Sequence, residues 1–219
     1  MARHLIWDWN GTLLDDRHHL LAAVNHAMSA CEFGSVDMAM LTSGFARPLR
    51  ALFHNLTGAR DERLWQRWHS AFEASGWTLP VAPLADGAYA ALREWRDFGN
   101  NQSIVSLEEY RKLRRGVQYN GVEKFFELIV GRRGQMIEDK SEMLRTFLRE
   151  TGLEPRDVAL IGDTVSDAAS GAAIGIQTVV CDVASFVSAD RDEIQDLGCL
   201  LVESLHDAIR LVFELPSEG

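Results

Sequence analysis

The sequence is poor in cysteine and in lysine, and the scarcity of cysteine excludes two kinds of site. Its three cysteines, Cys31, Cys181 and Cys199, include no close pair and no CxxC spacing. An odd number of widely spaced cysteines argues against a disulfide framework and against a zinc site, and it fits a reducing cytoplasm. Among the 22 basic residues only three are lysines, namely Lys112, Lys124 and Lys140. We therefore expect a cytoplasmic protein in which few lysines are available for binding or catalysis.

Long apolar runs and an excess of positive charge are also missing. No segment approaches the roughly 20 consecutive apolar residues that a membrane-spanning helix needs. The first residues, Met1-Ala2-Arg3-His4, do not have the layout of a signal peptide. The formal net charge of −10 gives no general attraction for nucleic acid or for an anionic membrane. We therefore expect neither as a partner, and any bound anion must be held by a local site.

The pattern of apolar residues changes twice along the chain. An apolar, β-prone segment, His4–Trp9, is closed by the turn signal Asn10-Gly11. The residues that follow are apolar at helical spacing, whereas after Pro83 short strand-like and helical segments alternate. Repeated βα units predict a parallel sheet with helices on both faces. The prediction is an α/β protein with a Rossmann-like parallel sheet, residues 1–15 and 81–219, and an inserted α-helical domain, residues 16–80.

The expected elements can be placed from the same pattern. The expected strands are His4–Trp9, Ser103–Ser106, Phe126–Val130, Val158–Ile161, Gln177–Val180 and Leu200–Val202. In the insert we expect helices over residues 20–31, 48–56 and from Leu64 to just before Gly76. In the sheet-forming part we expect helices over residues 84–98, 108–118, from Lys140 onward, 166–174 and 204–213.

Ligands of parallel sheets bind beyond the carboxyl ends of the strands, so the loops there are the places to look for chemistry. The first of these loops reads Asp8-Trp9-Asn10-Gly11-Thr12-Leu13-Leu14-Asp15. In extended backbone Asp8 and Asn10 point to one side and Trp9 to the other. Gly11 permits a tight turn that brings backbone amides near an anion. The alternative is a capped strand end, because Asp and Asn-Gly are common in turns.

Three further positions follow later strands or open the next helix. Asp163 follows an apolar strand and Asp167 comes four residues later, a spacing of carboxylates that suits a hard, oxygen-binding cation. The alternative is that Asp163 or Ser166 only caps the following helix. Lys140 stands near a helix start, where an anion is favoured, and Ser106 closes a strand. Taken alone, the lysine fits a solvated surface residue and the serine fits a strand end.

In this order, these residues resemble the four motifs of the haloacid dehalogenase-like (HAD) hydrolase superfamily. The resemblance covers nearly the whole chain and is to the phosphatase branch with a helical cap after the first motif, the phosphoglycolate phosphatase-like members. It implies a Mg²⁺-dependent phosphatase that hydrolyses a small phosphate monoester through an aspartyl-phosphate on Asp8. Under the resemblance Mg²⁺ is held by Asp8, the backbone carbonyl of Asn10 and Asp163, with Asp167 ordering its outer shell. Ser106 and Lys140 bind the phosphoryl oxygens, and Thr12 supports the loop.

The chain departs from the family pattern at Asn10, where the phosphatases usually carry an aspartate that acts as general acid and base. Such proton transfer typically contributes roughly 10²–10⁴-fold, most for alkoxide leaving groups. Phosphonate-cleaving relatives use a cap lysine, but no lysine precedes Lys112. Dehalogenases do not need the acidic loop that contains Asp163 and Asp167. Two functions therefore stay open: a working phosphatase, or a catalytically weakened relative that binds phosphorylated ligands in a regulatory role.

The helical insert is expected to close over the site and to select the substrate. Arg47 could meet a second anionic group of that substrate, and the alternative is a solvated arginine at a helix end. For Arg132 and Arg133 the same two interpretations apply, contact with an anionic group of the substrate or a solvated side chain. A small phosphorylated metabolite is the expected partner of a monomer or homodimer, and the sequence does not identify the ester.

Overall fold

The computed structural model describes residues 4–46, 48–134, 139–183 and 191–214. It divides into two compact units, one of Met1–Asp15 with Pro83–Gly219 and one of Asp16–Ala82. Each unit is considered separately below. The first unit contains the sheet, and the second consists of the helices that the sequence inserts after the first strand.

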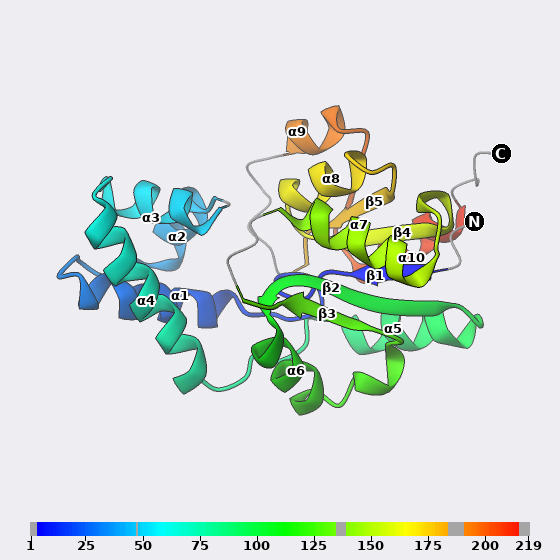
Figure 1. The fold of residues 1–219 in the computed structure, drawn as a ribbon, viewed down its shortest axis with the longest axis horizontal. Coiled ribbons are helices and arrows are strands. Elements are labelled where there is room, and N and C mark those ends of the chain that lie inside the picture. Colours follow the sequence, from blue (N-terminus) through cyan, green and yellow to red (C-terminus); the bar gives the residue numbers. More distant parts are fainter. Residues whose placement is uncertain (1–3, 47, 135–138, 184–190, 215–219) are drawn as a thin grey trace. The chain divides into compact units, whose positions relative to one another are not determined.

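A parallel sheet of six strands forms the centre of the first unit, in the order β3-β2-β1-β4-β5-β6 (Figure 1). All five neighbouring pairs are parallel. The predicted α/β fold class with a Rossmann-like parallel sheet is confirmed. The strands are β1 (His4–Trp7), β2 (Asn101–Glu109), β3 (Ile129–Arg132), β4 (Val158–Gly162), β5 (Gln177–Cys181) and β6 (Leu200–Val202).

Helices cover both faces of this sheet, as expected for repeated βα units. Helices α7 and α8 lie on one face and α5 and α6 on the other (Figure 1). Their bounds, with those of the two C-terminal helices, are α5 (Ala88–Asp97), α6 (Tyr110–Tyr119), α7 (Lys140–Thr151), α8 (Val165–Ala172), α9 (Arg191–Asp196) and α10 (Leu205–Glu214). Short 3₁₀ turns, Glu123–Phe125 and Pro155–Asp157, precede β3 and β4.

The core of the sheet unit follows from the apolar faces of these elements. Met143, Leu144 and Phe147, one face of α7, pack on apolar residues of β1, β2 and β4. All four residues of β1 are buried. The indole nitrogen of Trp7 donates to the side-chain oxygen of Gln102 at 2.8 Å, so this buried polar pair is satisfied inside the core. The centre of the sheet is therefore rigid where its strands deliver the site residues.

The second unit is a cluster of four helices. They are α1 (Arg17–Ala30), α2 (Met38–Gly44), α3 (Leu49–Thr57) and α4 (Glu62–Thr78). Trp68 is fully buried, and its ring stacks on those of Trp65 and Phe72 at centroid distances of 5.9 and 5.3 Å. These tryptophans therefore pack the core of the unit.

Several element boundaries differ from the predicted ones. Helix α4 continues through Gly76 to Thr78 and does not stop before the glycine. Strand β2 runs three residues past Ser106, with an irregularity in its pairing to β3 between Ser106 and Glu109. Helices α2 and α9 were not predicted, because seven and six residues are too short for a clear helical period. Within the described residues, no helix combines the length and the apolar character that crossing a membrane requires.

Candidate active site

The ends of two neighbouring strands bring the first two acidic residues together. Strands β1 and β4 pair in register, with Trp7 opposite Ile161. Asp8 extends this pairing, since its backbone N–H donates to the carbonyl of Ile161 at 2.9 Å. Asp8 and Asp163 thus follow adjacent parallel strands at the carboxyl edge of the sheet, where such folds bind ligands.

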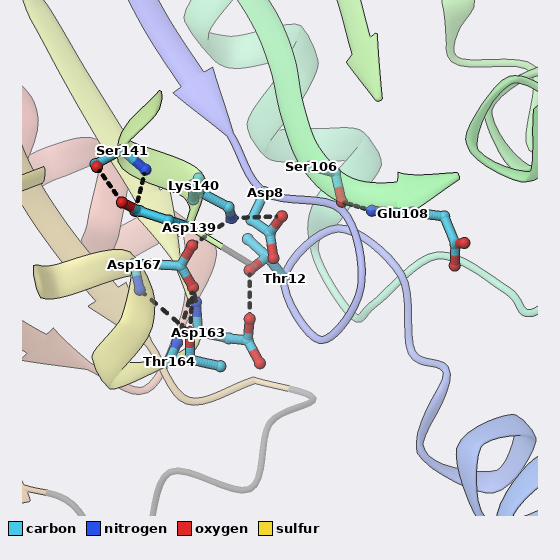
Figure 2. Close-up of polar contacts among 10 residues, drawn as sticks. All are labelled: Asp8, Thr12, Ser106, Glu108, Asp139, Lys140, Ser141, Asp163, Thr164 and Asp167. Carbon is cyan, nitrogen blue, oxygen red and sulfur yellow. Dashed lines mark hydrogen bonds and ion pairs between the residues drawn. The ribbon is translucent and has the colours of Figure 1, made fainter. Parts of the chain in front are cut away.

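Lys140 joins this edge from α7. Its ammonium nitrogen lies 2.7 Å from Oδ1 of Asp8 and forms a second, close ion pair with Oδ1 of Asp167 (Figure 2). Lys140 is 3% exposed, Asp8 8% and Asp167 1%. A lysine at this depth needs charged partners, because an unpaired buried ammonium is strongly disfavoured. Lys140 is therefore not a solvated surface residue.

The position of Asp167 is fixed by the start of α8. Thr164 is the N-cap of this helix, and its side chain and that of Asp167 form a reciprocal capping box. Oδ2 of Asp167 accepts from the hydroxyl of Thr164 at 2.6 Å and from its backbone N–H at 3.1 Å. The alternative that Asp163 or Ser166 caps this helix is wrong, because Thr164 occupies the cap. Asp167 uses one oxygen for the helix and the other for Lys140.

The loop after β1 packs closely on Asp163. Gly11 has a φ of 76°, a left-handed conformation that favours glycine. A Cβ at Gly11 would lie 2.2 Å from Oδ2 of Asp163, so no larger residue fits there. The hydroxyl of Thr12 donates to Oδ1 of Asp163 at 3.3 Å. The turn predicted from Asn10-Gly11 thus brings the first loop against the carboxylate that follows β4.

Burial and pairing shift the ionisation of these groups in different directions. Burial raises the pKa of Asp8 above the ordinary aspartate range, although Lys140 opposes the shift. Burial alone would lower the pKa of Lys140, but the carboxylates of Asp167 and Asp8 raise it overall. Burial would likewise raise the pKa of Asp167, yet Lys140 and the hydrogen bonds from Thr164 lower it overall. Lys140 and Asp167 therefore form a stable ion pair, and Asp8 is held less firmly in its charged form than Asp167 is.

Three buried carboxylates face one ammonium group in this arrangement. Asp8, Asp163 and Asp167 each offer an oxygen atom, and these atoms all lie within 4.8 Å of one another. Lys140 balances only one of the three formal negative charges. A buried set of oxygen ligands with excess negative charge fits a hard divalent cation. The described residues therefore include an acidic triad that could bind a metal ion.

Comparison with known proteins identifies the family. The family model for haloacid dehalogenase-like hydrolases matches residues 5–181, a range that contains Asp8, Asp163 and Asp167. The chain belongs to this family. The resemblance drawn from the four motifs is thereby confirmed.

Curated relatives of this family member are distant in sequence. The chain is 25% identical over 182 residues to the tyrosine-protein kinase PtkA of Mycobacterium tuberculosis, and the match covers 80% of the chain and 60% of the relative. It is 21% identical over 177 residues to the pyrophosphatase PpaX of Halalkalibacterium halodurans, covering 80% of the chain and 81% of the relative. The chain thus spans about 60% of the length of the mycobacterial relative that it matches.

Solved structures share the fold of this family member over almost its whole length. A predicted phosphatase from Clostridium acetobutylicum superposes with a TM-score of 0.82 at 18% sequence identity, covering 98% of the chain and all of that structure. A haloacid dehalogenase-like family hydrolase from Streptococcus pneumoniae gives a TM-score of 0.79 at 16% identity, covering 96% and 98%. At these identities the likeness concerns the fold.

The remaining predicted site residues have different environments. Ser106 is 2% exposed on β2, the strand next to β1, and its hydroxyl accepts a hydrogen bond from the backbone N–H of Glu108 at 3.2 Å (Figure 2). Asn10 is half-buried and forms an isolated bridge with Leu14. Arg47 lies outside the described residues. Thr164 was missed, although the spacing Thr164-x-x-Asp167 is a capping-box signature in the sequence.

Proposed function

We propose that this hydrolase is a phosphatase that releases phosphate from a small phosphate monoester, with Asp8 as the nucleophile. The observation that carries the proposal is the buried contact of Asp8 with Lys140, beside Asp163 and Asp167. An aspartate held at 2.7 Å from a lysine, in a group with excess negative charge, fits phosphoryl transfer better than a structural role. The names of the curated relatives, a pyrophosphatase and a tyrosine kinase, also denote phosphoryl chemistry.

Mg²⁺ is the cation that we propose for the acidic triad. Its ligands would be the carboxylates of Asp8 and Asp163 and the backbone carbonyl of Asn10, with Asp167 ordering the outer shell. When bound, the ion supplies positive charge that lets an anionic nucleophile approach an anionic phosphate. The donor set is made of oxygen atoms only, which is what Mg²⁺ prefers.

The chain's own residues would carry out two displacements. In the first, a carboxylate oxygen of Asp8 forms a bond to phosphorus while the bond to the leaving oxygen breaks, which gives an aspartyl-phosphate and an alkoxide or aryloxide that takes its proton from solvent water. In the second, water adds to the phosphorus, free phosphate leaves and the carboxylate of Asp8 is restored. Lys140 and the hydroxyl of Ser106 would bind the phosphoryl oxygens, and Thr12 would hold the loop against Asp163.

Asn10 limits which esters the site can cleave quickly. An amide can orient a leaving group or a water molecule by hydrogen bonding, but it does not exchange a proton near neutral pH. We therefore expect good turnover of aryl, enol or acyl phosphates, whose leaving groups need little protonation, and slow turnover of alkyl phosphates. The same residue favours the second candidate function, a weakened relative that binds a phosphorylated ligand in a regulatory role.

The helical unit, Asp16–Ala82, would act as the cap that selects the substrate, and Arg47 could meet a second anionic group there. We propose a small phosphorylated metabolite as the partner, a monomer or homodimer as the active form, and the cytoplasm as the location. The candidate esters are sugar phosphates, phosphoglycolate and aromatic phosphates, and of these the aromatic esters have the leaving group that needs least protonation.

The test is Mg²⁺-dependent phosphate release from a panel of metabolite phosphates and one aryl phosphate. Asp8→Asn removes the nucleophile with almost no change in size, and Asp86→Asn makes the same change at an exposed position as a control. Activity that needs Mg²⁺, disappears in Asp8→Asn and persists in Asp86→Asn is the expected result. A folded, Mg²⁺-loaded protein without turnover, but with measurable binding of a phosphate analogue, would instead favour the regulatory role.

A further inference from the structure

A glycine in the middle of α6 is the feature that the proposed function leaves unexplained. Glycine in a helix interior costs about 1 kcal/mol relative to alanine. Gly116 is buried, and it is not among the glycines with a left-handed backbone, so conformational freedom does not account for it. A Cβ at Gly116 would lie 3.1 Å from Cζ2 and 3.2 Å from Nε1 of Trp9. The glycine therefore leaves the space that the indole of Trp9 fills.

Trp9 is the residue directly after Asp8, and its backbone holds the loop in place. Its carbonyl accepts hydrogen bonds from the backbone N–H groups of Leu13 at 3.0 Å and of Leu14 at 2.9 Å. Its side chain is 1% exposed. A displacement of this indole would therefore move the backbone on which the carboxylate of Asp8 depends.

The loop is thus held from both faces of the sheet. Lys140 at the start of α7 contacts the carboxylate of Asp8, and α6, on the opposite face, receives the indole of Trp9 at Gly116 (Figure 1). This arrangement matches the alternation of side chains in extended backbone, in which Asp8 and Trp9 point to opposite sides.

We propose that Gly116 is a positioning residue: by seating Trp9 against α6, it sets the placement of Asp8 for attack on phosphorus. The inference rests on the proposed role of Asp8 as the nucleophile. It predicts that Gly116→Ala lowers activity in a chain that stays folded. Alanine improves helix propensity, but its methyl group forces the indole to shift by a few tenths of an ångström. A misplacement of 1 Å can cost about 10²-fold in rate, so this smaller shift should lower kcat roughly 3- to 10-fold.

The experiment compares kcat, KM and the urea midpoint of the full, Mg²⁺-loaded chain, with an aryl phosphate as the substrate. Gly116→Ala should lower kcat with KM within about twofold of the wild type, and the urea midpoint should show that the variant is fully folded in the assay. Gln118→Ala, at an exposed position of α6, makes a smaller gain in helix propensity away from Trp9 and should leave kcat unchanged. If kcat falls only because part of the Gly116→Ala protein is unfolded in the assay, the proposal is overturned.

A double-mutant cycle with Trp9→Phe tests the contact itself. Phenylalanine lacks the atoms nearest to the added methyl group, so Gly116→Ala should cost less in kcat in the Trp9→Phe background than in the wild type. Equal costs in the two backgrounds would refute the coupling.

A further readout keeps this inference distinct from the proposed function. If the wild type releases no phosphate from any ester, the proposed function fails, and amide hydrogen exchange then decides the positioning. Faster exchange of the Leu13 and Leu14 amides in Gly116→Ala, but not in Gln118→Ala, would support the link from α6 to the loop. Unchanged exchange would refute it.

Discussion

Lys140→Met keeps most of the length of the lysine side chain and removes its charge. In the folded protein this charge lies against Asp8 and Asp167, both of which are buried. Its loss would leave two carboxylates without their cationic partner in a group that already contains Asp163. The variant therefore measures how far the fold depends on the charge balance of the site.

The expected loss of stability is large. Removal of one partner from a buried ion pair typically costs about 3–5 kcal/mol, because the other charge stays buried without compensation. For a chain of this length that corresponds to a fall in Tm of roughly 6–20 °C. The loss should shrink in acid. The lowered pKa of Asp167 stabilises the wild type above the ordinary carboxyl pKa of about 3.9, and this contribution is lost as the pH falls below it.

Urea unfolding followed by circular dichroism at pH 7 and at lower pH measures the loss. The solutions should contain EDTA, since a divalent cation at the same carboxylates would offset the missing ammonium, and added Mg²⁺ should narrow the difference. Lys124→Met, at an exposed lysine, is the matched control. Asp8→Asn together with Lys140→Met should recover part of the loss. The reasoning is refuted if Lys140→Met costs no more than Lys124→Met, or if the loss is the same at every pH.

Two further predictions concern protonation. Burial lowers the pKa of His4 to about 4, so the folded state excludes its charged form, and stability that is complete above about pH 6.5 should fall by at most about 3 kcal/mol between pH 6.5 and 4. His4→Gln keeps a partner for the hydroxyl of Ser103, which lies 2.9 Å from the imidazole, and should flatten the dependence of the urea midpoint on pH; an unchanged slope would contradict this. Asn10→Asp should raise turnover of an alkyl phosphate by about 10²–10⁴-fold and that of an aryl phosphate much less. Equal gains on the two esters, measured by phosphate release, would show that leaving-group protonation is not what Asn10 limits.

The sheet and the order of the site residues were predictable from the sequence because both follow from short-range patterns. Buried parallel strands are continuous apolar runs, and the polar residue after each run marks the carboxyl edge. Asp8 and Asp163 were therefore assigned to one site from the ends of two such runs, and the contact of Lys140 with Asp8 agrees with that assignment.

Other features depend on contacts between residues far apart in the chain, which periodicity does not encode. The packing of Trp9 on Gly116 joins positions more than 100 residues apart, and the expected helix over residues 108–118 gave Gly116 no particular role. The continuation of α4 through Gly76 has a similar cause, since the packing of the aromatic face of the helix outweighs the low helix propensity of one glycine.

The two carboxylate oxygens of Asp167 have different partners, and this affects which residues would change in a related chain that lost its activity. One oxygen begins α8 and the other neutralises Lys140, so a descendant that no longer turned over substrate would still need this residue in order to fold. The side chain of Asp8 begins no helix, and its carboxylate is paired with Lys140. The presence of Asp167 is therefore weak evidence that a related chain is an active enzyme, whereas replacement of Asp8 would indicate that activity has been lost.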